Sequence, residues 1–334
     1  MYVKQLSATS YQELAQSMRI SLPIEQTVKW AYYTKTIPGR TPWGFFCIEE
    51  NEEPVALLAL TDYLTHGYHY LRAHHGPSWC VVPTPQQEED ALKAIALFAR
   101  QHHWNHVFIR LAVKSDLPSC SYVLSSIPYD TTVVVDLSGT DEDILARMKT
   151  RGRRDVRKAL REAPITCAVE TQKAIQSFAE YYPVMIETAQ RDGFSPAPEQ
   201  EYHDFISLLG KEHCMVSVGR DSDGQVVNWA IDTISSNKAV HYFAASSTRT
   251  MKQYVTDRLY YFCFCELAKR GCTSVDLMGI GSEFSPSLNS LNTFKTKFAK
   301  DVTPIAPDRD YPLRPIAYKL LQGAKSVRRL VKKH

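Results

Sequence analysis

The sequence lacks the features of a secreted, membrane-spanning or disulfide-stabilised chain. Its eight cysteines lie apart, mostly within apolar stretches, and none forms a CxxC pair. This pattern is typical of reduced thiols in the core of a cytosolic protein rather than of a disulfide scaffold or a zinc centre. No apolar run is long enough to span a bilayer, and residues 1–6 lack the apolar segment of a secretory signal peptide. We therefore expect a cytoplasmic protein.

Several catalytic and binding signatures are also missing. No Ser/His/Asp or Cys/His arrangement predicts nucleophilic catalysis. The adjacent histidines at 74–75 and 102–103 are expected to point apart, and no acid or cysteine lies at ligand spacing, so no metal site is predicted. The glycine-rich loop with which acyl-CoA enzymes bind pyrophosphate is absent, because the nearest equivalent, residues 190–193, precedes no good helix.

The modest net charge of +3 hides a strongly basic segment, residues 147–161. It follows three acids, residues 141–143, which suit the first turn of a helix, and it ends before Pro164. Such a basic helix favours phosphate-rich partners, although a solvated helix face would carry the same charges. Against one acid, Asp155, the segment holds eight basic residues: Arg147, Lys149, Arg151, Arg153, Arg154, Arg157, Lys158 and Arg161.

A second basic segment forms the tail, residues 314–334, which contains seven lysines and arginines and no acid. Apolar residues recur at helical spacing among these charges, which predicts an amphipathic basic helix. Such a helix can lie on anionic lipid, or it can dock on the protein with a wet outer face. The apolar positions are Ile316, Leu320, Leu321, Ala324, Val327, Leu330 and Val331.

The chain of 334 residues is longer than a usual single core, and its elements repeat in one order. A hairpin, a strand, a helix and a further strand are predicted in each half. In the first half they are 44–48 with 55–60, 68–71, 85–103 and 107–111; in the second they are 215–218 with 226–234, 239–244, 257–270 and 274–278. We therefore expect an α/β (α+β) fold of two related domains, residues 1–140 with 313–334, and residues 141–312.

The most informative stretch runs from Asp276 to Gly281 and is followed by residues 292–298. An apolar strand that ends in two glycines allows a close backbone approach. The second piece alternates lysines and phenylalanines, Phe294-Lys295 and Lys297-Phe298. A lysine held against aromatic rings is partly desolvated and can stabilise an anion that develops during a reaction. The same alternation also occurs on ordinary half-buried strands.

An ordered set of such motifs resembles the Fem/MurM (FemABX) family of peptidoglycan-bridge aminoacyltransferases. The basic helix carries RRDVRKA, and the segment after it ends in TAQRDGF. The strand HYFAASS, the strand end DLMG and the Phe294-Lys295 pair follow in the order of that family. In the first half, Trp30 with Lys35, residues 75–77 and residues 133–137 fit it too. No single motif is specific, but the ordered set covers nearly the whole chain.

The resemblance implies two tandem GNAT-like acyltransferase domains. It also implies transfer of an amino acid from aminoacyl-tRNA to a stem-peptide amine of a peptidoglycan precursor, for cell-wall synthesis. Lys295 would then stabilise the oxyanion and Phe294 would shape the acyl pocket, whereas Lys297 is expected to be a packing residue. The reaction requires no cofactor beyond aminoacyl-tRNA as co-substrate.

The resemblance also implies residues that bind substrates. The acceptor phosphates would be bound by Lys35, near Trp30, and by Arg249, with Lys252 and Tyr254 close behind. The acceptor arm of the tRNA or the phosphates of the precursor would face the basic helix, at Arg151, Arg153, Arg154, Arg157 and Lys158.

The chain departs from the family pattern in two places. An acidic residue is expected after the strand 107–111, but Ala112-Val113 stands there, and no heptad-patterned insertion between 165 and 220 predicts a coiled-coil arm. We therefore expect a compact member. The basic tail favours a lipid-linked rather than a nucleotide-linked precursor and peripheral contact with the inner membrane face. Three alternatives remain: an aminoacyl-tRNA–protein transferase, an acyl-CoA N-acetyltransferase and a non-catalytic RNA-binding module. The sequence does not identify the amino acid that is transferred.

Overall fold

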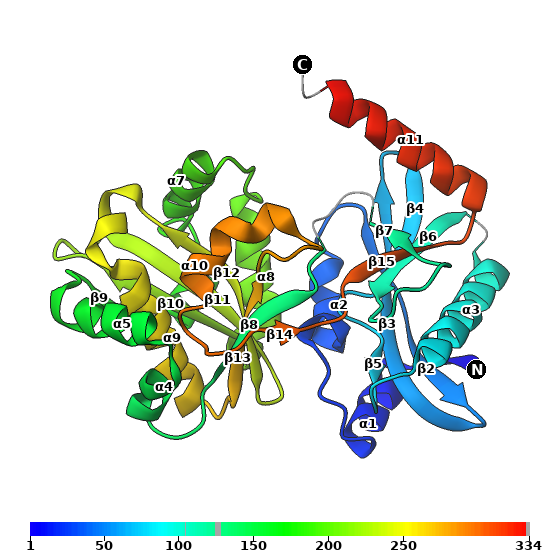
Figure 1. Ribbon diagram of the computed structural model, residues 1–334, viewed down its shortest axis with the longest axis horizontal. Helices are drawn as coiled ribbons and strands as arrows, with labels where there is room; N and C mark the ends of the chain where they lie inside the picture. Colours follow the sequence, from blue (N-terminus) through cyan, green and yellow to red (C-terminus); the bar gives the residue numbers. More distant parts are fainter. Residues whose placement is uncertain (104, 124–127, 332–334) are drawn as a thin grey trace. The chain divides into compact units, whose positions relative to one another are not determined.

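The computed structural model describes residues 1–103, 105–123 and 128–331. The chain divides into two compact units. The first contains Met1–Asp130 and the chain from Ile305 onward, and the second contains Thr131–Pro304. Figure 1 shows a mixed sheet with helices in each of them.

The first unit is built on a sheet with strand order β1-β2-β3-β4-β6-β15-β7, with β5 paired to β3. The strands are β1 (Tyr2–Leu6), β2 (Arg40–Glu50), β3 (Glu53–Thr65), β4 (Tyr68–Arg72), β5 (Ser78–Trp79), β6 (His106–Ala112), β7 (Ser121–Tyr122) and β15 (Asp308–Pro312). The helices are α1 (Ala8–Ser17), η1 (Ile24–Gln26), α2 (Val28–Thr34), α3 (Pro85–His102) and α11 (Pro315–Val331). Among the described strands of this sheet, β4 and β6 form the one parallel pair, and α3 connects them.

The two faces of this sheet are covered by different helices. Helix α3 begins with a capping box between Thr84 and Gln87 and packs its apolar side on the face that contains Leu71 and Ile109. Successive strand residues point to opposite faces. Tyr70 and Phe108 therefore lie on the other face, where they contact α11, and α1 and α2 cover the same face over β2 and β3.

The second unit is built on a sheet with strand order β14-β8-β13-β12-β11-β10-β9. The strands are β8 (Thr131–Asp136), β9 (Thr166–Val169), β10 (Cys214–Arg220), β11 (Val226–Ser235), β12 (Lys238–Ser246), β13 (Ser274–Gly279) and β14 (Thr303–Pro304). The helices are α4 (Asp141–Arg147), α5 (Thr150–Glu162), α6 (Thr171–Gln176), α7 (Tyr182–Asp192), α8 (Glu199–His213), η2 (Thr248–Gln253), α9 (Val255–Lys269), η3 (Pro286–Leu291) and α10 (Asn292–Lys295).

Here too one parallel pair is connected by a helix, because α9 joins β12 to β13. Helix α9 lies with α4 and α5 on the face of Ala230 and Val275. The opposite face carries an aromatic cluster in which Phe178 and Tyr202 surround Trp229. The predicted repeat of hairpin, strand, helix and strand is present in both units.

The limits of the units differ from the predicted domain boundaries at 140 and 312. Strand β8 was expected in the first domain, but it pairs with β13 and β14 and so belongs to the second sheet. Strand β15 was expected in the second domain, but it pairs with β6. A buried ion pair stabilises the pairing of β15 with β6, since Arg110 donates to both carboxylate oxygens of Asp310 at 2.7 and 2.9 Å.

The cysteines are free thiols, five of them buried. Burial raises the pKa of the Cys47 thiol to about 11, so this side chain behaves as a small apolar residue. No helix in the described ranges combines the length and apolar character required to cross a membrane.

Candidate active site in the second unit

The end of β13 has an unusual backbone that is fixed by side chains. Met278 has φ +63°, a left-handed conformation that residues other than glycine rarely adopt. Its N–H donates to Asp276 Oδ1 at 2.7 Å, and the hydroxyl of Thr132 on β8 donates to the same oxygen. Such a conformation costs about 1–3 kcal/mol and persists where the surroundings determine it. Asp276 therefore holds the strand end in this turn.

The loop after β13 lies tightly against the segment that leads into α10. The N–H of Gly281 donates to Asn292 Oδ1 at 2.7 Å, and Asn292 Nδ2 donates back to the Gly281 carbonyl at 3.0 Å. A Cβ on Gly281 would lie 2.1 Å from Asn289 Oδ1, which real atoms do not tolerate. The close backbone approach predicted for this glycine is thus present, and it fixes where α10 begins.

Lys295, at the end of α10, turns its ammonium towards the strand end. Its Nζ donates to the carbonyls of Gly279 at 3.0 Å and Met278 at 3.3 Å. Burial lowers the pKa of Lys295 from 10.5 to about 8, although the carboxylate of Asp276 opposes this shift. A lysine has three N–H donors. One donor therefore remains that no described residue accepts.

The cation that contacts aromatic rings is Lys297, not Lys295. Its Nζ lies 4.5 Å from the ring centre of Phe294 and 5.2 Å from that of Phe298. It also forms ion pairs with Asp257 on α9 and with Asp155 on α5, the latter at 3.6 Å. The short helix turns Lys295 away from this cluster. Lys297 is consequently a packing residue, as expected, and the reason given for the desolvation of Lys295 has to be corrected.

Phe294 belongs to an aromatic cluster between α9 and α10. Its ring lies edge-on to Tyr260 at 5.1 Å and to Phe298 at 5.3 Å, and Tyr260 stacks on Phe298 at 5.5 Å. Phe294 is half-buried, whereas Tyr260 and Phe298 are buried. The half-buried ring next to Lys295 is therefore held by a rigid apolar support.

Strands β12 and β13 are paired only where they begin. Their parallel register joins Lys238–Val240 to Ser274–Asp276 and then stops, although β12 continues to Ser246. Backbone groups past this point are not joined in a ladder between the two strands. Lys295 lies at the end of β13. An extended ligand could form hydrogen bonds to the unpaired strand edge there.

The predicted basic helix is two helices. α4 ends at Arg147, and Met148 and Lys149 have extended backbone angles before α5 begins. Arg153 folds back and donates to the Met148 carbonyl at 2.5 Å, so this arginine caps the break. Gly152 makes room for the Lys297 carbonyl, because a Cβ there would lie 2.2 Å from its oxygen.

The remaining basic residues of α5 stay largely on the surface. The side chains of Arg151 and Arg154 are 57% and 73% exposed and share Asp155 at 3.6 and 3.0 Å. Arg157 is exposed. Lys158 lies over the ring of Tyr254, 4.7 Å from its centre, so two predicted binding groups meet. The hydrogen bond with Tyr254 raises the pKa of Lys158, which keeps it charged.

The predicted phosphate-binding loop lies in η2. Arg249 is 58% exposed and is paired with Asp221 at 2.6 Å, while Lys252 is exposed. Tyr254 adopts a left-handed conformation, φ +57°, at the start of α9. Arg249 and Tyr254 therefore occupy the two ends of one short segment.

The two substrate-binding residues predicted in the first unit, Lys35 and Trp30, differ from each other in burial. Lys35 directly follows α2 and is exposed, with its Nζ 5.3 Å from the ring centre of Tyr32. Trp30 is only 7% exposed and lies edge-on to Tyr33 at 5.2 Å. Trp30 is thus part of the core under α2 and supports this helix, whereas Lys35 presents its charge to solvent.

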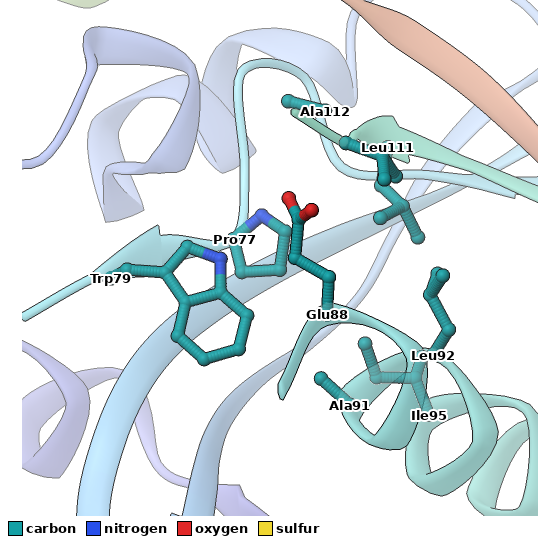
Figure 2. A pocket seen from close by; sticks show the side chains of 9 residues that line it. Pro77, Trp79, Glu88, Ala91, Leu92, Ile95, Leu111 and Ala112 are labelled. Atoms are coloured by element: carbon teal, nitrogen blue, oxygen red, sulfur yellow. The ribbon is translucent and has the colours of Figure 1, made fainter. Parts of the chain in front are cut away.

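A carboxylate does lie beside Ala112, although it comes from α3. Figure 2 shows Glu88 pointing into a small pocket with Ala112, Pro77 and Trp79. Both carboxylate oxygens of Glu88 accept backbone N–H groups, from Lys114 and Ser115, each at 2.8 Å. Its side chain fixes the loop after β6, so it does not simply replace the missing acid.

The sequence prediction missed several groups of polar residues that the fold brings together, one of them in each of the following places. His74 and His75 were expected to point apart, but the Nδ1 atoms of both approach Glu25 Oε1, at 3.7 and 3.2 Å. A left-handed backbone at His75, φ +53°, turns the second ring towards the first. In the second unit, His241 Nδ1 lies 2.7 Å from Asp232 Oδ1. These two residues are register partners on β11 and β12 only because the register shifts after Ile231, and nothing in the sequence signals that shift.

Comparison with known proteins finds a family and a fold. The sequence model of the FemAB family matches residues 220–326, which contain β12, α9, β13 and the Phe294-Lys295 pair. FemX has a similar structure, with a TM-score of 0.75 and 15% identity over 96% of this chain and 100% of FemX. No curated protein matches the chain by sequence.

Two further structures share the fold. A C-terminal domain assigned to a lysylphosphatidylglycerol synthetase of Agrobacterium fabrum has a TM-score of 0.55 and 14% identity over 95% of this chain and 97% of that one. A tandem GNAT protein from the clavulanic acid biosynthesis pathway has a TM-score of 0.52 and 12% identity over 93% of this chain and 98% of that one. At such identities the matches show the fold alone.

The family match and the tandem GNAT-like fold support a transferase. The family model covers the segment that builds the Lys295 site, and the FemX fold extends over nearly the whole chain. The resemblance found in the sequence is thereby confirmed for residues 220–326, which match the FemAB family.

Proposed function

We propose that the protein transfers an amino acid from aminoacyl-tRNA to a stem-peptide amine of a lipid-linked peptidoglycan precursor. The amine attacks the ester carbonyl, a C–N bond forms, and the C–O bond to the tRNA ribose breaks. The amine proton passes to the leaving ribose oxygen through solvent or the substrate, so no general-base side chain is needed. What the enzyme supplies is positioning and stabilisation of the tetrahedral oxyanion.

The ammonium of Lys295 carries this proposal. Two backbone carbonyls fix it at a strand end, and one N–H is left for a developing oxyanion. A pKa of about 8 keeps most of the side chain protonated at neutral pH. Removing one donor of this kind typically lowers kcat by about 10²–10³-fold. Phe294, half-buried and supported by Tyr260, would contact the side chain of the amino acid being transferred.

The exposed cations of α5 would bind the tRNA backbone. Arg151, Arg154, Arg157 and Lys158 present positive charge on one helix, and such charges attract phosphates without sequence preference. Arg153 is directed to the helix start, so its predicted role in phosphate binding is not retained.

In the second unit, the exposed charges of Arg249 and Lys252 near η2 would bind acceptor phosphates, with Tyr254 contributing a ring beside Lys158. In the first unit, the exposed Lys35 after α2 would also bind phosphate. No cofactor other than aminoacyl-tRNA as co-substrate is proposed.

The outer face of α11 favours the lipid-linked form of the acceptor. Tyr318 docks the helix, with 2% of its surface exposed, but Ile316 and Leu320 are 80% and 71% exposed. These two lie one turn apart, on the same side of the helix, next to the exposed Lys319. Apolar residues beside lysines are typical of helices that lie on anionic lipid. The predicted basic residues Arg328 and Arg329 have no described side chains, and Lys332 and Lys333 lie outside the described residues.

The experiment is transfer with defined donors and acceptors. The full chain is incubated with a pool of charged tRNAs and either lipid-linked or nucleotide-linked precursor, and the added mass is measured. One aminoacyl residue per precursor is expected, faster on the lipid-linked form. Lys295→Met should abolish this product, whereas Lys300→Met, an exposed lysine nearby, should leave it unchanged.

Three outcomes would reject the proposal. The first is acetyl transfer from acetyl-CoA without tRNA, the second is addition to a protein amine instead of the precursor, and the third is full turnover by Lys295→Met. An equal rate on both precursors would reject the lipid-linked acceptor alone.

A further inference from the structure

A cluster of possible metal ligands lies in the first unit, far along the chain from Lys295. It contains Asp62 on β3, His69 on β4 and His106 on β6. His69 Nδ1 lies 3.0 Å from Asp62 Oδ1, and His106 Nε2 lies 3.3 Å from the same oxygen. We propose that these three side chains bind a zinc ion.

The sheet register places the three side chains on one face. His69 is the partner of Leu64 across β3 and β4, and Asp62 lies two residues before Leu64. Because strand residues alternate between faces, Asp62 and His69 point to the same side. His69 is in turn the register partner of His106 across β4 and β6. Three neighbouring, hydrogen-bonded strands therefore present the ligands, which makes the arrangement rigid before any ion binds.

Burial and access suit a metal ion. His106 is 2% exposed, and both of its ring nitrogens are buried. Its Nε2 lies against the Asp62 carboxylate at 3.3 Å, whereas its Nδ1 has no hydrogen-bond partner in the described part of the chain. An ion bound between Asp62 and His106 would give the buried Nε2 a strong partner in place of this contact. The side chains of Asp62 and His69 are 22% and 32% exposed, so an ion can enter from solvent.

The chemistry of the donors selects the kind of ion. Two neutral imidazoles and one carboxylate are typical zinc ligands, and a site with three protein ligands keeps a fourth tetrahedral position for water. Nitrogen-rich sites of this kind do not favour Ca²⁺ or Mg²⁺, which prefer oxygen ligands. The register of the strands indicates that the ion would join β3, β4 and β6 and stabilise this part of the sheet.

The two other clusters of this kind are less suitable. Burial lowers the pKa of His74 well below its usual value, and Arg72, His75, Arg40 and Arg110 lower it further. These positive charges would repel a metal ion from the site formed by Glu25, His74 and His75. The cluster of Asp232, His241 and Cys263 is buried throughout, with exposures of 0%, 6% and 0%, so an ion has no route into it.

The test is binding of Zn²⁺ to the full chain after treatment with a chelator and removal of any affinity tag. Calorimetry should give one ion per chain, and Co²⁺ should give the visible absorption of a tetrahedral site. His69→Gln and Asp62→Asn should each weaken binding by at least about tenfold. The control is His66→Asn, because His66 lies in the β3–β4 turn and its Nδ1 contacts only Thr65 among the described residues; it should bind like the wild type.

Either of two results would overturn the proposal. One is the absence of stoichiometric binding by the wild-type chain. The other is equal affinity in the His69→Gln, Asp62→Asn and His66→Asn variants, which would place the ion elsewhere. Circular dichroism distinguishes lost binding from lost folding, and two ligand variants on different strands keep the test decisive if one does not fold.

Discussion

Replacing Lys295 by methionine should change the pH dependence of folding as well as abolish transfer. Burial lowers the pKa of Lys295 from 10.5 to about 8. Between these values the unfolded chain binds a proton that the native chain does not, so the free energy of unfolding rises with pH in the wild type. At low pH the buried charge is a penalty on the native state, and deprotonation removes this penalty.

The magnitude follows from the two pKa values. Taking 10.5 for the unfolded chain and 8 for the native one, stability should increase by about 2 kcal/mol between pH 7.5 and pH 9.5. Lys295→Met has no such proton and should lack this increase. Methionine also leaves the Met278 and Gly279 carbonyls without their donor, but that loss is the same at both pH values and cancels in the difference.

The assay is urea denaturation of both proteins at the two pH values, with the change in stability compared between them. Turnover of the wild type should in parallel decrease as pH rises through about 8, because the uncharged form of Lys295 stabilises an oxyanion poorly. An equal rise in stability in both proteins would refute the reasoning, since the titrating group would then be another one. Turnover that stays constant to pH 10 would refute the oxyanion role.

Three further predictions concern other parts of the chain. Lys297→Met should destabilise the second unit by about 3–5 kcal/mol in urea denaturation, because the buried Asp257 loses its ion-pair partner and Asp155 keeps only Arg151 and Arg154; a change below 1 kcal/mol would contradict this. Arg157→Glu should weaken tRNA binding, measured by filter retention, and reduce its salt dependence, with an unchanged salt slope as the contrary result. Ile316→Ser with Leu320→Ser should reduce binding to anionic vesicles, whereas Leu97→Ser, a similarly exposed position on α3, should not; equal effects would remove the lipid role of α11.

The order of elements was predictable from the sequence because it depends on local patterns. Apolar alternation marked the hairpins, and helical spacing marked α3, α9 and α11. The close approach at Gly281 was predictable as well. What failed depended on partners distant in sequence: β8 was placed in the wrong unit, since nothing in its own residues specifies that it pairs with β13 rather than with the first sheet.

The other features that the sequence did not predict depend on local irregularities of the backbone. The basic segment breaks at Met148–Lys149, although neither glycine nor proline marks the break, because Lys149 N–H donates to the Lys297 carbonyl instead of continuing a helix. The left-handed backbone at His75 brings two adjacent histidines onto Glu25. The pairing of Asp232 with His241 requires a register shift after Ile231, which a strict alternation does not predict.

The two lysines of this site show how environment separates a packing residue from a candidate catalytic one. Lys297 is buried beside two carboxylates, so its charge is compensated inside the fold and is not available to a ligand. Lys295 is held by carbonyl dipoles, and in the described part of the chain no carboxylate forms an ion pair with it. Carbonyls orient an ammonium without neutralising it.

The site thus keeps a partly desolvated positive charge that lowers native stability at neutral pH, together with a strained Met278 that aims the carbonyls at it. Folding alone would favour a neutral or ion-paired side chain at position 295. Both unfavourable features become useful only when an anion lies next to Nζ, because the charge is then oriented in advance and need not reorganise. This is the arrangement expected of a lysine that stabilises an anion formed during turnover, because no carboxylate of the described residues forms an ion pair with it.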